Sequence, residues 1–274
     1  MKRSYLLVIT LICLLSSVGF AQKSKDKDKY KKKEFCSKQN NWSNRDKVSV
    51  SDLRESTIST RDVKVDSKNG RITVIGENRN DVLVKACVRA WARSEADARS
   101  VVNSIRVNTS GVITADVPKD SNASVSYEIR VPNSSDLDLA SSNGRIGIQQ
   151  VNGKVRFKTS NGRVTLDDVT GDVTGQTNNG RVTVKFSGSS FRGSGMNVET
   201  NNGRVSLYMP TNFAANVEAG TGNGRLSSDF SELSISGKKR KYGANRVSAS
   251  LNGGGAKVRI VTGNGRVSIH RSSN

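Results

Sequence analysis

Histidine, cysteine and aromatic side chains are scarce in this sequence, and their scarcity limits the chemistry that it can support. The 274 residues include one histidine (His270), three cysteines and only 5% aromatic residues. A single histidine near the C-terminus excludes a metal site built from several histidines and argues against a histidine-based triad. The phosphate-binding loop, the G-x-G-x-x-G fingerprint and the C-x-x-C motif are also missing. We therefore predict that the protein is not an enzyme and uses no metal or cofactor.

A small group of acidic residues is the feature that an enzyme could use. Asp167, Asp168 and Asp172 lie close together in the sequence, and some parallel β-helices are polysaccharide lyases or hydrolases that use acids with arginine. Asp167 and Asp168 are adjacent, however, and a strand would point them to opposite faces. We interpret the three as turn residues that offset nearby basic side chains. A polysaccharide-acting β-helix enzyme, a lyase or hydrolase, is kept as the alternative function.

Glycine, in contrast, is frequent, with 25 residues, and much of it belongs to a repeated motif. The pattern [ST]-x-N-G-R-[VIL] occurs seven times. We assign its Asn-Gly pairs to structural turns, because Gly adopts positive φ without steric cost and Asn tolerates the left-handed region. The pairs are Asn69-Gly70, Asn143-Gly144, Asn161-Gly162, Asn179-Gly180, Asn202-Gly203, Asn223-Gly224 and Asn264-Gly265.

Apolar residues surround each motif at fixed places. Counted from the Asn as zero, positions −6, −4, +3 and +5 are apolar in 26 of 28 cases, and the exceptions are Gly175 and Ser228. A period of two on each side indicates two strands that are buried on one face. The apolar residues fall on even-numbered positions before the Asn and on odd-numbered positions after it. This shift predicts a corner at which the chain bends while the apolar side chains of both strands continue to point inward.

The spacing of the motifs distinguishes between two folds. Asn143, Asn161 and Asn179 are 18 residues apart, and Gly153 and Gly171 fall midway. A meander of hairpins would also use Asn-Gly turns, but a fixed period with one buried stripe per unit is typical of a solenoid. We predict an all-β parallel β-solenoid, or β-helix, of about 18–23 residues per coil.

Stacked coils would align equivalent residues at the strand spacing of about 4.8 Å. Position 0 then forms a column of asparagines whose amides can bond from coil to coil, and position −2 a column of hydroxyls. Position +4 forms an outward column of Thr and Ser, with Gly147 as its gap. Position +2 forms an outward arginine column, which consists of Arg71, Arg145, Arg163, Arg181, Arg204, Arg225 and Arg266.

The N-terminus has the composition of a secretory signal peptide. Residues 1–21 begin with basic residues, continue with an apolar run from Tyr5 and end in Gly19-Phe20-Ala21, so we predict export to the periplasm, the cell surface or the medium after cleavage near Ala21. An uncleaved anchor is an alternative, although the run is short for a bilayer. Residues 22–47 are predicted to form a basic, disordered linker.

The cysteines that follow the signal peptide are Cys36 and Cys87. Two thiols in an exported protein favour a disulfide over a metal pair. Closing a loop of this length would stabilise the fold by roughly 4 kcal/mol in the chain-entropy model. The bond would attach the N-terminal segment to the folded body.

The remainder divides into two predicted regions. Residues 48–132 hold the first repeat and a strand–helix–strand cap, in which Ser94 caps a helix that runs to about Ile105. Residues 133–274 hold the continuous repeats, with a Gly/Ser insertion at 187–195. The 41 residues between Asn223 and Asn264 predict an irregular or hairpin coil that includes the basic stretch 238–241. The last copy is expected to close the stack.

These features together resemble the bacterial "putative adhesin" family of exported β-solenoid (head-GIN-like) domains. The resemblance rests on the repeated S/T-x-N-G-x-[IV] blocks, the strand–helix–strand at about 82–117 and the sequence L-N-G-G-G-A-K-V-R-I-V-T-G-N-G-R-V-S-I at 251–269. It covers roughly residues 50–270. The resemblance implies a surface or envelope role and supplies no catalytic residues. This chain differs from the family pattern in placing Arg after every Asn-Gly.

The net charge supports a specific hypothesis about partners. It is +20 for the whole chain, and a field of this size favours anionic partners. Arginine presents a planar fork suited to phosphate, sulfate or carboxylate. We therefore expect an adhesin-like scaffold whose arginine column binds anionic polysaccharide, lipopolysaccharide or extracellular DNA. Nucleic acid would be bound without recognition of its sequence. Self-association of the chain is a further expected contact. The contrary interpretation is that the arginines only keep one face soluble.

Overall fold

The computed structural model describes residues 35–37, 47–233 and 245–272. The predicted signal peptide, nearly all of the predicted linker and the basic stretch 238–241 lie outside these residues. Among the described residues, no helix has both the length and the apolar composition needed to cross a membrane.

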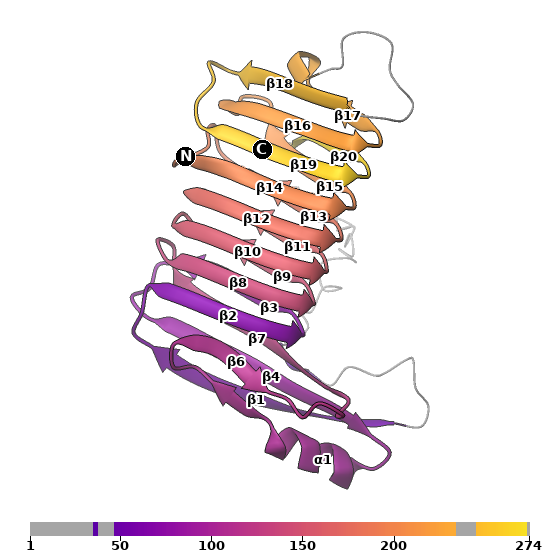
Figure 1. Ribbon diagram of the computed structural model, residues 1–274. Helices are drawn as coiled ribbons and strands as arrows, with labels where there is room; N and C mark the ends of the chain where they lie inside the picture. The colour runs from indigo at the N-terminus through magenta and orange to yellow at the C-terminus, as the bar shows by residue number, and fades with distance from the viewer. Residues whose placement is uncertain (1–34, 38–46, 234–244, 273–274) are drawn as a thin grey trace, which may run out of the picture. The chain divides into compact units, whose positions relative to one another are not determined.

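Each repeat contributes two strands that meet at the Asn-Gly corner (Figure 1). The strands that end at the Asn form one sheet: β2 (Asp62–Asn69), β8 (Asp136–Asn143), β10 (Lys154–Asn161), β12 (Asp172–Asn179), β14 (Gly195–Asn202), β16 (Ala215–Asn223) and β19 (Lys257–Asn264). The strands that follow form the other: β3 (Ile72–Glu77), β9 (Ile146–Gln149), β11 (Val164–Asp167), β13 (Val182–Lys185), β15 (Val205–Pro210), β17 (Leu226–Ser228) and β20 (Val267–Ser272). We call these the first and second sheets.

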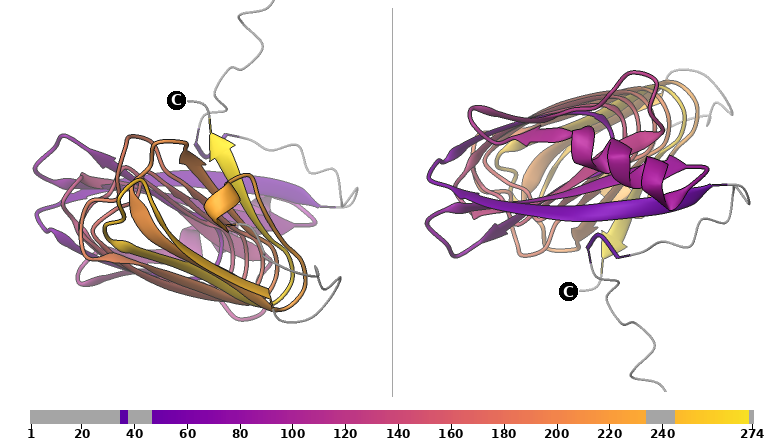
Figure 2. Two further views of the ribbon diagram at one scale, coloured as in Figure 1. Left: turned by 90° about the horizontal axis from the view of Figure 1, so that it is seen from above. Right: turned by 90° about the horizontal axis from the view of Figure 1, so that it is seen from below.

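Neighbouring repeats pair in parallel, with equivalent residues in register. Val155 of β10 pairs with Val173 of β12, and Val164 of β11 pairs with Val182 of β13. The predicted parallel solenoid is therefore confirmed, and the alternative meander of antiparallel hairpins is wrong for these repeats. The two sheets form the two layers seen in Figure 2, and their inward side chains share one core.

The burial pattern follows the alternation of apolar residues in the sequence. The apolar residues at −6, −4, +3 and +5 are buried in every repeat, except that Leu226 of the terminal repeat is half-buried. Gly175 occupies its apolar position because the Phe157 ring of the preceding coil fills the space, so that a Cβ at Gly175 would lie 1.9 Å from the Phe157 Cζ atom. Ser228, in the short strand β17, accepts a hydrogen bond from the Phe230 amide at 3.0 Å.

The glycines of the Asn-Gly corners are needed mainly because the backbones of adjacent coils approach closely. A Cβ on Gly162 would lie 1.7 Å from the carbonyl oxygen of Gly144, and one on Gly203 would lie 1.6 Å from that of Gly180. The prediction that these turns need left-handed backbone was largely wrong. None of the seven asparagines has positive φ, and among the corner glycines only Gly70, Gly203 and Gly265 have it. The residues with positive φ, Gln150 and Asp168, lie instead at the other corner of the coil, just before Gly153 and Gly171.

The corner asparagines bond from coil to coil. The Asn161 side-chain nitrogen donates to the Asn143 side-chain oxygen at 3.0 Å, and Asn179 donates to Asn161 at 3.0 Å. The same bond joins Asn143 to Asn69, Asn202 to Asn179 and Asn264 to Asn202. The amides of Asn143, Asn161, Asn179 and Asn202 each donate to one neighbour and accept from the other. The column therefore holds these successive coils in register.

The insertion between the first two repeats lies at one end of the stack. The repeats at Asn69 and Asn143 are adjacent in space, although 74 residues separate them. The intervening chain adds β4 (Val82–Ala92), β5 (Arg106–Asn108), β6 (Val112–Asp116) and β7 (Ala123–Pro132), together with the helix α1 (Glu95–Ser104). Strand β1 (Val48–Ile58) pairs antiparallel with β4, which pairs antiparallel with β7.

The predicted helix is confirmed with its cap. Ser94 accepts a hydrogen bond from the Asp97 amide at 3.1 Å and donates to the Asp97 carboxylate at 2.7 Å. Ala98 and Val102 are buried against the sheet. At the other end of the helix, Arg54 of β1 donates to the carbonyl oxygens of Val102 and Ile105, which joins the helix to the strand.

The order of the coils differs from the order of the sequence at the C-terminal end. The copy at Asn264 was expected to close the stack, but β19 lies between β14 and β16, and β20 between β15 and β17. The last repeat is therefore inserted between the two that precede it. The end of the first sheet is β18 (Asn245–Leu251), which runs antiparallel to β16. Because β17 and a 3-10 helix (Ser231–Leu233) lie between these strands in the sequence, the expected irregular or hairpin coil takes the irregular form.

An ion cluster on the outer surface of the first sheet stabilises this insertion. Arg259 of β19 contacts the carboxylates of Glu199 on β14 and Glu218 on β16. Glu218 also pairs with Lys257 at 2.9 Å and with Arg246 of β18 at 3.6 Å. The basic strand β19 thus separates two strands whose acidic residues would otherwise repel each other. The carboxylate of Glu218 is largely buried.

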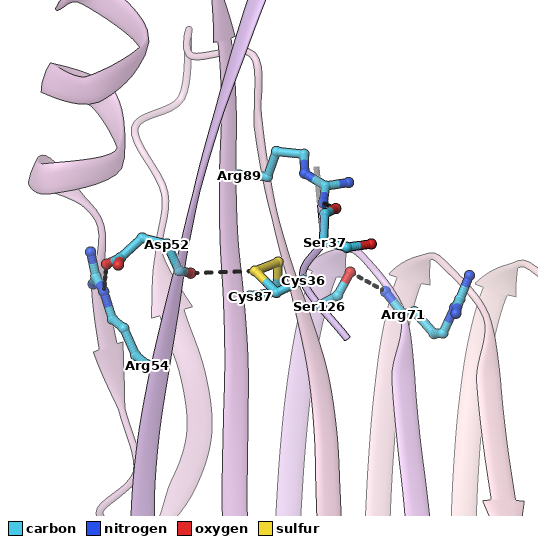
Figure 3. The surroundings of a disulfide bond; sticks show 8 residues. All are labelled: Cys36, Ser37, Asp52, Arg54, Arg71, Cys87, Arg89 and Ser126. Atoms are coloured by element: carbon cyan, nitrogen blue, oxygen red, sulfur yellow. Dashed lines mark hydrogen bonds and ion pairs between the residues drawn. A yellow bond between two sulfur atoms is a disulfide. The ribbon is translucent and has the colours of Figure 1, made fainter. Parts of the chain in front are cut away.

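A disulfide joins Cys36 to Cys87 of β4, with a Cα–Cα distance of 5.3 Å (Figure 3). Cys87 is buried. Beside it, the Arg89 guanidinium donates to the carbonyl oxygen of Ser37 at 3.0 Å. These two contacts attach residues 35–37 to the sheet, which confirms the predicted disulfide.

Replacing a corner glycine should destabilise the stack much more than replacing an outward glycine. We expect Gly162→Ala to lower the free energy of unfolding by about 1–3 kcal/mol, because its Cβ would overlap a backbone carbonyl that has no space to move. Gly147→Ala is the matched control, since a Cβ there meets no atom within 4 Å. Urea unfolding followed by circular dichroism measures both. Equal losses in the two variants would contradict the role of backbone approach.

The Glu218 cluster should make stability depend on pH. The hydrogen bond from Lys257, assisted by the charges of Arg259 and Arg246, holds the pKa of Glu218 below its usual value. A depressed pKa stabilises the fold above the unfolded value of about 4.3, and that stabilisation disappears as pH falls through the folded value. We expect Glu218→Gln to lose about 1–2 kcal/mol at pH 7 and to approach wild type in acid.

The matched control for this prediction is Asp138→Asn. Asp138 occupies the same position of the repeat on the same sheet but is exposed, so its loss should have a smaller effect at every pH. Unfolding free energies measured at about five pH values between pH 3 and pH 7 would test both variants. A constant difference between Glu218→Gln and wild type over this range would disprove the electrostatic explanation.

Candidate functional site

The arginine column lies immediately after the Asn-Gly corners, at the start of each strand of the second sheet. All seven side chains are exposed. Their backbones are aligned by the parallel ladder: the Ile146 amide donates to the Arg163 carbonyl at 3.0 Å, and the Val164 amide donates to the Arg181 carbonyl at 2.9 Å. In space the column runs in the order Arg71, Arg145, Arg163, Arg181, Arg204, Arg266 and Arg225.

Six of these guanidinium groups lack a partner in the part of the chain that the structure describes. Arg71, Arg145, Arg163, Arg181, Arg204 and Arg266 make no side-chain hydrogen bond or ion pair with residues 35–37, 47–233 or 245–272. On the outer surface of the first sheet, Arg259, Lys257 and Lys64 are paired with acids. The exposed side chains of Lys154, Arg156 and Lys158 on β10 have no such partner among the described residues. These six arginines therefore form a line of like charges without compensating carboxylates in the described region.

The two predicted columns of hydroxyls point in different directions. The position +4 column faces away from the core beside the arginines, but it is less exposed than the sequence predicted. Thr165 and Thr183 are half-buried, and Ser206 and Ser268 are buried. The position −2 column is buried inside the corner, where Thr221 donates to the Gly265 carbonyl and Thr262 to the Gly203 carbonyl. Of the two hydroxyl columns, solvent reaches Thr73, Thr165, Thr183 and Ser227 of position +4.

A third outward column lies at position +6 and was not identified from the sequence. It contains Gln149, Asp167, Lys185, Tyr208, His270 and Asp229 on successive strands or just beyond them. The rings of Tyr208 and His270 are stacked, with centroids 4.8 Å apart. The Nδ1 atom of His270 lies 3.5 Å from the Asp229 carboxylate. The repeat register was the signal that could have revealed this column.

An open groove with a volume of about 920 Å³ adjoins this column. Tyr208 and Lys185 form one part of its lining, and the loop after β13 forms another. Phe186 of that loop packs face to face on Phe213, with centroids 4.9 Å apart, and edge to face on Phe191 at 5.6 Å. These aromatic contacts hold the base of the loop against the core.

The clustered acids are only partly brought together. Asp167 and Asp168 both line the groove, whereas Asp172 is an exposed residue at the start of β12 in the other sheet. The Asp168 carboxylate accepts a hydrogen bond from the Ser187 amide at 2.5 Å, which supports its interpretation as a turn residue. Within the described ranges, no group of three or more His, Cys, Asp or Glu side chains has the arrangement of a metal site.

No protein-family model and no curated protein matches this chain. Solved structures do resemble it, with low identity. One is described as a "putative cell adhesion protein" from Clostridium sporogenes, with 11% identity, a TM-score of 0.44 and coverage of 81% of this chain and 100% of the other. Another is a "putative adhesin" from Bacteroides fragilis, with 11% identity, a TM-score of 0.33 and coverage of 81% and 97%.

A third structure is described as a "putative lipid binding protein" from Parabacteroides distasonis, with 8% identity, a TM-score of 0.29 and coverage of 81% and 97%. The resemblance that the repeats indicated thus extends to solved structures described as adhesins. Identities and TM-scores at this level do not assign an activity or a ligand to this chain.

Proposed function

We propose that this chain is a non-enzymatic, exported scaffold of the cell envelope or surface that binds linear polyanions along its arginine column. The observation that carries the proposal is the alignment of seven exposed guanidinium groups on one rigid stack. Six of them have no counter-charge among the described residues. A bound polyanion would supply the missing charges.

The spacing of the column favours a polymer over a small anion. Adjacent strands are about 4.8 Å apart, so seven positions extend over roughly 29 Å. Each guanidinium can form two parallel hydrogen bonds with a phosphate, sulfate or carboxylate. A linear polymer that follows the column could therefore meet several arginines at once, and each contact would release condensed counterions.

The disulfide supports the proposed location. Disulfides persist in oxidising compartments such as the periplasm and the cell surface and are rare in the cytosol. The bond between Cys36 and Cys87 is thus consistent with export. Residues 1–21 lie outside the described ranges. Cleavage of a signal peptide near Ala21 therefore remains part of the proposal.

Removing three arginines from the middle of the column should weaken polyanion binding. We expect the triple variant Arg163→Ser/Arg181→Ser/Arg204→Ser to leave immobilised heparin at a lower salt concentration than wild type. For single-stranded poly(dT), the slope of log affinity against log salt should decrease in magnitude by about 2, because roughly 0.7 counterions are released for each phosphate contact. Fluorescence anisotropy at several salt concentrations measures this slope.

The matched control removes the same charge from the opposite sheet. Lys154, Arg156 and Lys158 are exposed on β10, so their triple change to Ser keeps the net charge equal to that of the first variant. This control should retain most of the wild-type slope. If both variants weaken binding equally, net charge rather than the column is responsible, and the proposal is wrong.

A further inference from the structure

The structure leads us to propose that the groove beside Tyr208 binds a sugar unit of an acidic polysaccharide, so that the ligand of the arginine column is a polysaccharide and not a nucleic acid. This inference rests on the proposed function. It adds a second contact region with a different chemistry from the column. The residues that carry it are Tyr208, Asp167, Lys185 and Asn212, all of which line the groove.

Tyr208 lines the groove, and one side of its ring is covered. On β15 it lies between Lys185 of β13 and His270 of β20. His270 stacks on the covered side, at 4.8 Å between centroids, and it does not line the groove. Lys185, the register partner of Tyr208 on the other side, does line it. A half-exposed aromatic ring with a fixed orientation provides an apolar platform for the C–H face of a sugar ring.

Polar groups surround this platform at positions suited to hydroxyl groups. Asp167 and Lys185 are register partners on adjacent strands, and Asn212, Ser187 and Ser189 are exposed around the groove. Carboxylates accept hydrogen bonds, ammonium groups donate them, and amides and hydroxyls do both. A mainly apolar hollow with a few convergent polar groups is the usual form of a small-molecule site.

The charge of the groove distinguishes between polysaccharide and nucleic acid. Single-stranded DNA also stacks on aromatic residues, but its sites are positively charged throughout. Here Asp167 and Asp168 contribute two carboxylates against one ammonium, from Lys185. Carboxylates repel phosphodiesters and uronate carboxylates alike, but they accept hydrogen bonds from the hydroxyls of a neutral sugar. The groove therefore fits a neutral sugar of an acidic polysaccharide better than a nucleotide, because every nucleotide of a nucleic acid carries a phosphodiester.

The groove and the arginine column lie on the same outer face of the second sheet. Lys185 and Tyr208 each lie four residues after an arginine of the column, Arg181 and Arg204. Four residues of strand span about 13 Å. A polysaccharide could thus place its acidic groups on the column and a sugar ring on Tyr208. Such a polymer carries both chemistries along one chain.

The test compares two polymers and three variants. The polysaccharide probe is an oligomer in which uronate units alternate with neutral sugars, called the polyuronate below. Binding of this oligomer and of poly(dT) is measured by isothermal titration calorimetry for wild type, Tyr208→Ala, Tyr208→Phe and Asp167→Asn. We expect Tyr208→Ala to weaken polyuronate binding about tenfold, the typical contribution of one aromatic contact, and to leave poly(dT) binding within about twofold. Tyr208→Phe should retain polyuronate binding. Asp167→Asn should weaken polyuronate binding only.

The outcomes separate this inference from the proposed function. If the arginine triple variant weakens both polymers but Tyr208→Ala changes neither, the groove is not a sugar site and the column still binds polyanions. If Tyr208→Ala weakens polyuronate while the triple variant changes nothing, the groove binds sugar and the column proposal fails. Equal loss of poly(dT) and polyuronate in Tyr208→Ala would indicate base stacking and overturn the inference. Thermal unfolding of each variant verifies that it is folded.

Discussion

The close approach of backbones at the Asn-Gly corners is the constraint on which the rest of the structure depends. At each corner the carbonyl of one coil occupies the place where a Cβ of the next coil would lie, so only glycine is compatible with the coil spacing. The asparagine just before it supplies a side-chain amide that bonds to its equivalents in the adjacent coils. Sterics therefore set how closely the coils approach, and hydrogen bonds set which residues are level with each other.

This fixed register determines the surface as well as the core. Because every coil is aligned at the corner, the buried aliphatic residues stack into a continuous interior, and the outward residues at +2, +4 and +6 form straight columns. The arginines do not take part in this mechanism. Their backbones belong to the ladder, but six of their side chains contact no hydrogen-bonding or ionic partner in the described residues. The features that build the solenoid and the features proposed to bind a ligand are thus physically separate.

Much of the architecture could be predicted from the sequence because it is local and repeated. The alternation of apolar residues around each Asn predicted the buried faces, and the 18-residue spacing predicted the parallel stack. Ser94 and Asp97 predicted the start of the helix. The position of the last coil could not be predicted from periodicity, because it depends on which strands pair across long separations. Its signal was electrostatic: Arg259 makes ion pairs with both Glu199 and Glu218.

The candidate site was predictable only in part for a related reason. The arginine column follows from the motif itself, whereas the stack of Tyr208 on His270 brings together residues from two repeats that are not consecutive in the sequence. His270 considered alone is an isolated surface histidine. The role of the corner glycines was also misjudged, because a sequence reveals that glycine is required but does not distinguish positive φ from close backbone contact. Only the geometry identifies the neighbouring carbonyl.

The variation among outward positions argues that the arginines have a purpose beyond solubility. On the first sheet, the equivalent outward position −5 is occupied by Lys64, Asp138, Arg156, Thr174, Asn197, Glu218 and Arg259. Solubility is thus achieved there with residues of either charge or none. At +2 the same cation occurs seven times, although aligned like charges repel and should destabilise the stack. Salt screens this repulsion, and a bound polyanion would reverse it. The six arginines that have no partner in the described residues are therefore consistent with the binding surface proposed above.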